Sequence, residues 1–164
     1  MQLAAHAYLD HLGMHYTKQA FPTTTEKGAA NVALALGFQP RQMVKTLIFE
    51  VDTGEKVLVM VGGDQNAISG HLKKAIGSRN IKLAHPDVVQ ETTGYVLGSV
   101  PPFHWQPPNF RSFVDAALLQ EDVLGVGTGQ WGEEILMTPA DLVKASRAIV
   151  VNLTDKAKPV VPNE

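Results

Sequence analysis

The chain has 164 residues, with 14 Lys and Arg against 16 Asp and Glu, a formal net charge of −2 and no cysteine. Hydrophobic residues at 45% and charged residues at 18% are typical of a globular protein and exclude wholesale disorder. The lack of cysteine excludes a disulfide scaffold, a thiolate zinc site and a cysteine nucleophile, and the net charge argues against a general polyanion binder, since such proteins are usually strongly basic.

One domain is expected over residues 1–154, followed by a flexible tail over 155–164. The first residues, MQLAAHAYLDHLG, have neither a basic region nor an uninterrupted apolar stretch, so they do not read as a signal peptide. The longest strongly apolar run, 57–61, is far shorter than the ~20 residues that span a bilayer. These features predict a soluble cytoplasmic protein that has no membrane partner.

Two helices are predicted before the first strand. The spacing of apolar residues indicates an amphipathic helix over 2–12 that ends at Gly13. A second helix is expected to begin at Thr23, which has capping-box spacing to Glu26, and to end at Gly37.

The middle of the chain alternates between strands and helices. MVKTLIFEV and KVLVMV predict a hairpin that turns at Asp52-Thr53-Gly54. Three further elements are expected before the next loop: a helix over 68–76, a strand over 81–84 and a helix from Pro86 to Gly94.

A loop rich in proline and aromatic residues follows over 95–110. Short strands are then expected around Phe113 and over 123–126, 135–137 and 149–151, with a helix that starts at Thr138. Hairpins mixed with irregularly spaced helices favour an α+β fold, in which helices flank one mixed, mostly antiparallel sheet.

Lys45 is an unusual residue for an apolar strand. Because side chains alternate between the two faces, Lys45 shares its face with Leu47, Phe49 and Val51. One interpretation is a lysine whose stem covers the sheet rim while its ammonium reaches water. The other is an ammonium at a pocket mouth that binds phosphate or polarises a carbonyl group.

The segment TTGYVLGSVPPFHWQPP places four of the ten prolines within eight residues, 101–108. Proline fixes φ, whereas Gly94 and Gly98 permit tight turns and close approach of a ligand. Three interpretations stay open: a rigid surface loop or hydrophobic plug, a polyproline ligand, or a platform on which a nucleobase stacks.

Residues 65–86 contain four basic residues and no acidic one, whereas residues 101–164 contain five basic and eight acidic residues. The four are Lys73, Lys74, Arg79 and Lys82. They form either a solvated helix face or a local electropositive patch that contacts RNA.

No metal or cofactor is predicted. His11 and His15 have i, i+4 spacing, but Gly13 lies between them, and there is no HExxH motif. The glycine-rich turns at 62–63 and 125–129 match neither a Walker loop nor a dinucleotide fingerprint, and no GxSxG motif occurs.

Taken together, several segments resemble the YbaK-type family of aminoacyl-tRNA editing domains, which are related to the domain inserted in bacterial prolyl-tRNA synthetases. The resemblance covers about residues 23–152. It is carried by TTTEKGAANVALALG, VKTLIFEV, VLVMVGGD, the LKKAIGSRNIKLAHPDVVQETTGY run, GSVPP, and GTGQWG with TPADL.

The resemblance implies a free-standing enzyme that hydrolyses the ester of a mischarged tRNA in trans, with tRNA(Pro) carrying Ala or Cys as the best guess. Its partners would be the 3′ acceptor end of that tRNA and, as a further candidate, a synthetase, but not DNA. In the family the lysine and the G-x-x-x-P loop act at the 3′-terminal adenosine, which assigns catalytic roles to Lys45 and Gly98. The implied substrate-binding residues are Phe21, Thr46, Thr93, Gly94, Ser99, Val100, Pro101, Pro102, Gly127, Thr128 and Gly129.

Two alternatives stay open, and two departures from the family pattern bear on the entrance for the acceptor stem and on the identity of the amino acid. The pocket could belong to a non-catalytic module that binds a nucleotide or an RNA 3′ end, or to a general hydrolase of small esters. Family members commonly have Gly where His104 follows Phe103, and some have Ser within the turn at 127–129.

Overall fold

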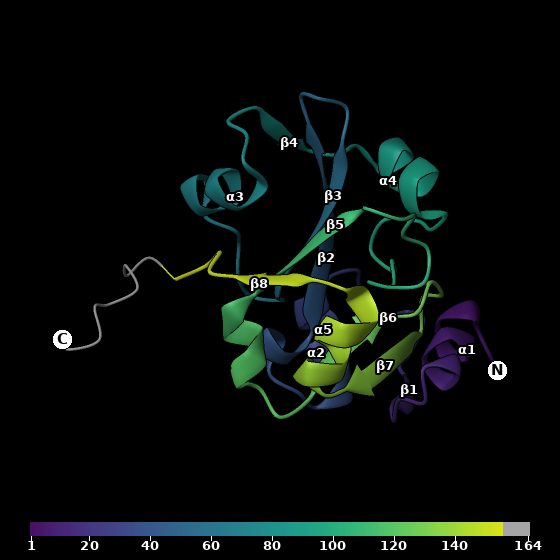
Figure 1. Ribbon diagram of the computed structural model, residues 1–164. Helices are drawn as coiled ribbons and strands as arrows, with labels where there is room; N and C mark the ends of the chain where they lie inside the picture. Colours follow the sequence, from purple (N-terminus) through teal and green to yellow (C-terminus); the bar gives the residue numbers. More distant parts are fainter. Residues whose placement is uncertain (156–164) are drawn as a thin grey trace.

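The computed structural model describes residues 1–155 and places their strands in two sheets with helices around them (Figure 1). The strands are β1 (Thr17–Ala20), β2 (Val44–Val51), β3 (Lys56–Gly62), β4 (Ile81–Leu83), β5 (Arg111–Asp115), β6 (Leu124–Gly127), β7 (Glu133–Met137) and β8 (Ile149–Val151). The helices are α1 (Ala4–His11), α2 (Ala29–Leu36), α3 (Ser69–Ile76), α4 (Pro86–Thr93) and α5 (Pro139–Ser146), with short 3₁₀ turns η1 (Pro40–Gln42) and η2 (Ala116–Gln120).

The larger sheet has the order β4-β2-β3-β5-β8, and the smaller one has the order β1-β7-β6. Within the larger sheet β4, β2 and β3 are antiparallel, whereas β5 and β8 are added in parallel. The smaller sheet is antiparallel throughout. A bridge between Met43 and Gly125 joins the two sheets beside the start of β2. The expected α+β class with mostly antiparallel pairing is confirmed, although two sheets replace the single one expected.

The second helix begins later than the sequence predicts. Gly28 has a φ of 127°, which lies outside the helical region, so the helix cannot extend back through it to Thr23. Residues before Gly28 form a turn instead, in which the Thr25 amide donates to the Pro22 carbonyl. The Thr23 carbonyl accepts a hydrogen bond from the Trp131 indole at 3.1 Å. The segment therefore ties α2 to the β6–β7 turn rather than lengthening the helix.

Strand β1 was not expected from the sequence. Its residues, TKQA, are mostly polar and exposed, so they lack the apolar alternation of a strand with one buried face. They become a strand by pairing with β7, from Thr17 opposite Leu136 to Ala20 opposite Glu133. This pairing places Phe21, the next residue, beside the β6–β7 turn, where it meets the Trp131 ring edge-on at 4.8 Å.

Strand β3 is buried along almost its whole length and separates two parts of the core. Val57, Val59 and Val61 pack with Leu72 and Ile76 of α3 on one side. The other side of β3 faces a cluster built from α1, α5 and the smaller sheet, whose members include Leu9, Leu58, Met60, Phe103, Leu124, Ile135 and Leu142. Because Leu47 and Phe49 join the α3 cluster, Lys45, which shares their face of β2, also lies on the α3 side.

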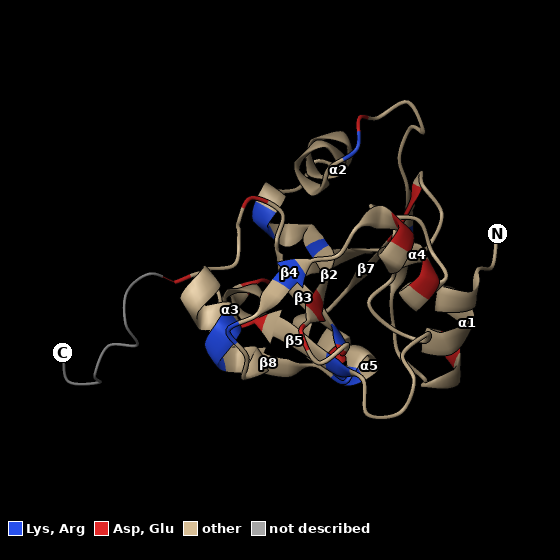
Figure 2. Ribbon diagram, turned by 90° about the horizontal axis from the view of Figure 1, so that it is seen from above, with Lys and Arg blue, Asp and Glu red and all other residues tan. Residues whose placement is uncertain are grey.

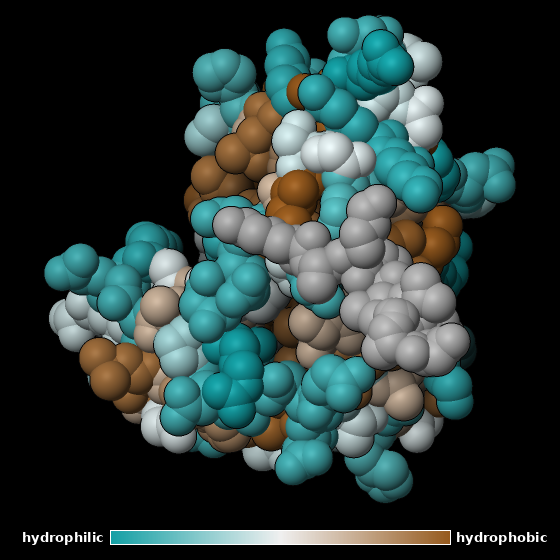
Figure 3. Space-filling view, turned by 90° about the vertical axis from the view of Figure 1, so that its left-hand side faces the viewer, coloured by the Kyte–Doolittle hydropathy of each residue, from teal (hydrophilic) through white to brown (hydrophobic). Residues whose placement is uncertain are grey.

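Charged residues are unevenly placed on this fold. Figure 2 shows Lys and Arg on α3 and β4 and acidic residues on α4. The face seen in Figure 3 is largely hydrophilic, with smaller hydrophobic areas between the polar side chains. Within residues 1–155, no helix has the length and apolar character needed to cross a membrane.

Candidate functional site

A concave pocket of about 160 Å³ lies between β2, α2, the loop at 97–100 and the β6–β7 turn. Seven residues that the sequence assigned to a site line it together: Phe21, Lys45, Thr46, Gly98, Ser99, Val100 and Gly127. Segments from distant parts of the chain thus converge on one cavity. Its remaining walls include the apolar side chains of Val32, Val44 and Trp131.

The other predicted substrate-binding residues do not line the pocket but hold its loops. Gly94 ends α4 with a φ of 83°, and the Thr93 hydroxyl donates to the Val89 carbonyl at 2.8 Å and accepts from the Tyr95 amide at 3.0 Å. Three more residues of this group are buried and engaged through hydrogen bonds: Pro101 and Pro102 through their carbonyls, and Thr128 through its hydroxyl.

The loop at 97–100 lies directly against the β6–β7 turn. The Gly129 amide donates to the Ser99 carbonyl at 2.7 Å. A Cβ on Gly127 would stand 2.9 Å from the Ser99 carbonyl oxygen, and one on Gly129 would stand 2.2 Å from the Tyr95 ring. Glycine at both positions therefore allows the loop to approach the turn this closely.

Gly127→Ala is expected to displace this loop without straining its own backbone, because the conflict is with the main chain of Ser99 and Val100. We expect a loss of about 1–2 kcal/mol in the free energy of unfolding, measured with urea, and about a tenfold loss of any activity that needs the loop. The matched control is Gly70→Ala in α3, where a Cβ meets nothing within 4 Å. Unaltered stability and activity in Gly127→Ala would contradict a role for this contact.

Two backbone amides of the loop are unpaired. Among the described residues, neither the Gly98 nor the Val100 N–H has a hydrogen-bond acceptor, whereas the Ser99 N–H donates to the Val96 carbonyl at 3.3 Å. Val100 is buried, so its free amide is costly unless a ligand accepts from it. Gly98 has a φ of 101°, a conformation that favours glycine. The pair can donate to a carbonyl oxygen that gains negative charge.

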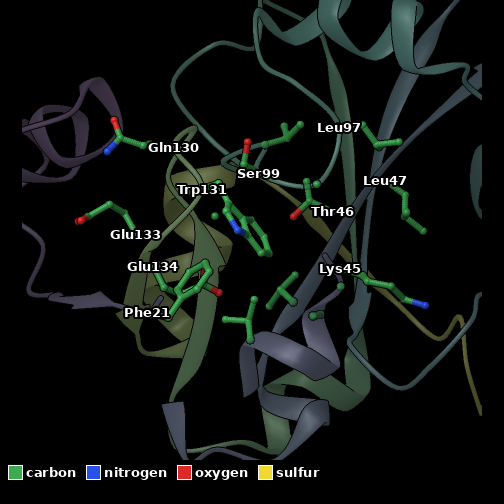
Figure 4. A pocket seen from close by; sticks show the side chains of 17 residues that line it. Phe21, Lys45, Thr46, Leu47, Leu97, Ser99, Gln130, Trp131, Glu133 and Glu134 are labelled. Atoms are coloured by element: carbon green, nitrogen blue, oxygen red, sulfur yellow. The ribbon is translucent and has the colours of Figure 1, made fainter. Parts of the chain in front are cut away.

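Lys45 borders this pocket from its outer side. Its ammonium donates to the Asn66 side chain at 3.0 Å, in the loop before α3. Figure 4 shows Thr46 pointing to the middle of the pocket and the Lys45 ammonium pointing away from it. The position suits contact with a group that passes over the pocket edge rather than one held inside it.

Glu134 is a pocket residue that the sequence analysis missed. It is only 7% exposed, and its side chain lies beside Phe21 (Figure 4). Burial raises the pKa of its carboxyl group from 4.5 to about 8. An acidic residue in a short strand ordinarily faces solvent, so only the doubled acid Glu133-Glu134 before an apolar run could have drawn attention to it.

His104 occupies a position where the family resemblance implies glycine, and its backbone has a conformation that favours glycine. Its φ is 77°, which a non-glycine residue rarely adopts. The His104 Nε2 lies 2.6 Å from the Tyr95 hydroxyl, and the His104 ring also contacts Tyr8. These contacts offset the energetic cost of the His104 backbone conformation. The hydrogen bond between Tyr95 and His104 also closes the chain segment between these two residues.

The four basic residues divide into two surfaces. Lys73, Lys74 and Arg79 line one depression at the end of α3. Lys82 of β4 instead lines another depression, together with the acidic residues Glu50 and Asp52. The structure thus brings together three of the four, on the side of β2 that carries Lys45. Within residues 1–155, no cluster of three or more His, Asp or Glu residues could hold a metal ion.

Residues 23–145 match the family model described as the aminoacyl-tRNA editing domain. The chain is 29% identical over 115 residues to the multifunctional Ser/Thr-tRNA deacylase ProXp-y of Escherichia coli strain K12, an alignment that covers 68% of each chain. It is 29% identical over 121 residues to the proline–tRNA ligase of Listeria monocytogenes serotype 4a, which covers 73% of this chain and 21% of the ligase.

The fold is also similar to that of a solved structure. A crystal structure described as a candidate trans-editing enzyme for prolyl-tRNA synthetase superposes with a TM-score of 0.81 at 27% identity. The superposition covers 91% of this chain and 93% of that one.

Proposed function

Because the chain belongs to the family of aminoacyl-tRNA editing domains, we propose that it is a free-standing aminoacyl-tRNA deacylase that hydrolyses the ester of a mischarged tRNA in trans. The amino acid is a small one, with Ala or Cys on tRNA(Pro) as the first candidates. The observation that carries the proposal is the convergence of Lys45 and the loop at 97–100, with its unpaired amides, on one pocket.

The chemistry needs no protein nucleophile, because an aminoacyl ester is already activated. A water molecule attacks the ester carbonyl carbon, and the carbonyl oxygen becomes an oxyanion that accepts hydrogen bonds from the Gly98 and Val100 amides. The bond to the ribose oxygen then breaks, that oxygen takes up a proton, and the free amino acid leaves. Loss of one such donor typically costs ~3 kcal/mol of transition-state stabilisation.

Lys45 contributes from the pocket edge. We assign its ammonium to the terminal phosphate of the acceptor strand. On binding, this anionic acceptor would replace the neutral Asn66 side chain as the hydrogen-bond partner of Lys45. Among the other expected residues, Phe21 and Thr46 meet the aminoacyl group inside the pocket, and Ser99 and Gly127 hold the loop that carries the two amides. Thr93, Gly94, Pro101, Pro102, Thr128 and Gly129 support these loops from behind.

A deacylation panel on one tRNA(Pro) transcript, charged in turn with Ala, Cys, Ser, Thr and Pro, tests the proposal. We expect hydrolysis of at least one small misattached amino acid and little loss of Pro-tRNA(Pro). Tight binding of tRNA or adenosine without turnover would favour the non-catalytic binding module instead. Equal turnover of simple amino-acid esters would favour a general esterase.

The basic end of α3 is assigned to the acceptor stem, and the site of action to the cytoplasm, where aminoacyl-tRNAs are made and used. A synthetase that hands over its tRNA remains a candidate second partner. Replacing Lys73 and Lys74 together with Ala is expected to raise KM for tRNA several-fold while kcat stays the same. The salt dependence of log(kcat/KM) should also become shallower by about 1–2 in slope.

The matched control for this pair is the double change Lys56→Ala, Lys144→Ala, which removes the same charge from other elements. An unchanged KM and salt slope in the α3 variant would remove Lys73 and Lys74 from the RNA contact. Lys82 shares its depression with acidic residues, so we expect a smaller effect of Lys82→Ala.

A further inference from the structure

Two polar groups of the pocket have no partner among residues 1–155. The Thr46 hydroxyl oxygen is inaccessible to solvent and makes no hydrogen bond with any described residue. The Glu134 carboxyl group, 7% exposed, has no hydrogen bond or ion pair with a described residue either. Buried polar groups are normally paired, so a solvent-inaccessible hydroxyl and a largely buried carboxyl group, both unpaired in one cavity, indicate that a ligand completes them.

The fold holds Glu134 in this position through its neighbouring strand. In the pairing of β6 with β7, Glu134 lies opposite Gly127, and Gly125 is two residues away on the same face. A Cβ on Gly125 would stand 3.2 Å from Glu134 Oε2, so the carboxyl group lies over a position that has no side chain. The rings of Phe21 and Trp131 line the same pocket and keep it apolar.

The charge state of Glu134 follows from these surroundings. The other charged residues of the pocket wall are Lys45 and Glu133, and both side chains point away from its middle (Figure 4). Burial is the only cause of the raised pKa, about 8, so the carboxyl group is mostly protonated at neutral pH. An undissociated acid presents one O–H donor and one carbonyl acceptor.

We propose that Glu134 and Thr46 form a polar subsite that selects an aminoacyl group with a side-chain hydroxyl, serine foremost. This inference rests on the proposed deacylase function and puts Ser ahead of Ala and Cys as the amino acid that is removed. A hydroxyl donates and accepts at once, which complements both an undissociated acid and the threonine hydroxyl. An alanyl group in the same place would leave both protein groups unpaired.

The other polar group of the substrate is its α-ammonium. A protonated carboxyl group does not neutralise a cation, and taking an ammonium out of water is costly without a counter-charge. The side-chain hydroxyl is therefore the better occupant of the subsite. Glu134→Gln distinguishes a bound hydroxyl from a bound α-ammonium, because Gln keeps a donor and an acceptor but can never become an anion.

The experiment compares kcat/KM for Ser-tRNA(Pro) and Ala-tRNA(Pro), prepared on the same transcript, in the wild type and three variants. The wild type is expected to prefer Ser by about 10- to 100-fold, the effect of one or two buried polar groups left unpaired. Glu134→Leu and Thr46→Val should bring the ratio close to 1, because kcat/KM for Ser-tRNA(Pro) falls towards the value for Ala-tRNA(Pro). Glu134→Gln should keep most of the preference for Ser.

A matched control is Ser112→Ala, which removes another buried, unpartnered hydroxyl that lies outside the pocket wall. It is expected to leave the ratio of the two substrates unchanged. Thermal unfolding of each variant separates a loss of folding from a loss of selectivity.

Equal kcat/KM for the two substrates in the wild type, or an unchanged ratio in Glu134→Leu and Thr46→Val, would overturn the subsite. A uniform loss on both substrates in Glu134→Gln would place the α-ammonium there and also overturn it. No hydrolysis of any charged tRNA would count against the proposed function itself, which distinguishes the two failures.

Discussion

Replacing Lys45 with Ala is expected to lower kcat/KM for aminoacyl-tRNA deacylation by about 100-fold. The change removes the proposed charge-assisted hydrogen bond to phosphate, worth ~1.5–3 kcal/mol, which would position the reacting ester. Because the effect arises from the RNA, hydrolysis of a simple amino-acid ester should fall much less. Single-turnover kinetics on both substrates measure this contrast.

Loss of the Lys45 side chain should not unfold the protein. Its ammonium makes one exposed hydrogen bond, to Asn66, so we expect less than about 0.5 kcal/mol of change in the free energy of unfolding. Lys45→Arg keeps the charge and should recover part of the activity. The control Lys56→Ala removes a lysine at the hairpin end of β3. The ammonium of Lys56 donates to the Gly54 carbonyl at 3.0 Å. Normal turnover by Lys45→Ala would remove Lys45 from the mechanism.

Glu134→Gln is expected to stabilise the protein at alkaline pH. The pKa of the Glu134 carboxyl group is about 8 in the folded chain, against an ordinary value of 4.5. Between these values the folded chain holds a proton that the unfolded chain has released, so the contribution of this group to stability falls as the pH rises. This stabilising contribution is fully present below pH 4.5, decreases as the pH rises to about 8, and is absent at higher pH. Gln carries no such proton.

The advantage of Glu134→Gln over the wild type should therefore grow by on the order of 3 kcal/mol between pH 5 and pH 9. Urea unfolding at one-unit pH intervals measures it. The matched change Glu133→Gln, one residue earlier on β7 and half-exposed, should show no comparable growth. Parallel stability curves for Glu134→Gln and the wild type would show that the carboxyl group is already ionised in the folded protein.

Much of the fold could be predicted because local signals coincide with the tertiary structure. The β2–β3 hairpin has apolar residues and a turn of its own, and glycine ends α2, α3 and α4 at Gly37, Gly77 and Gly94. Strand β1 could not be predicted in this way, because its polar residues become a strand only through their pairing with β7. The start of α2 depends on the backbone of Gly28, which capping-box spacing does not encode.

The candidate site, like the fold, could be predicted only in part. Segments of the chain that resemble the family supplied Lys45 and the loop at 97–100, and these do line one pocket. Glu134 was missed because its burial depends on Gly125 of the adjacent strand and on Phe21, which is far away in sequence. The direction of the Lys45 ammonium likewise depends on Asn66, whose loop position is a tertiary feature.

The close contact of the loop at 97–100 with Gly127 and Gly129 has a consequence for how this protein can evolve. In the proposed mechanism, main-chain groups fixed by that contact face the ester, whereas the amino acid meets exchangeable side chains such as Phe21, Thr46 and Glu134. On this proposal, main-chain groups carry out hydrolysis, and side chains of the pocket wall select the amino acid. A single nucleotide change at one wall position could redirect the enzyme to a different error of translation while the hydrolytic frame stays intact.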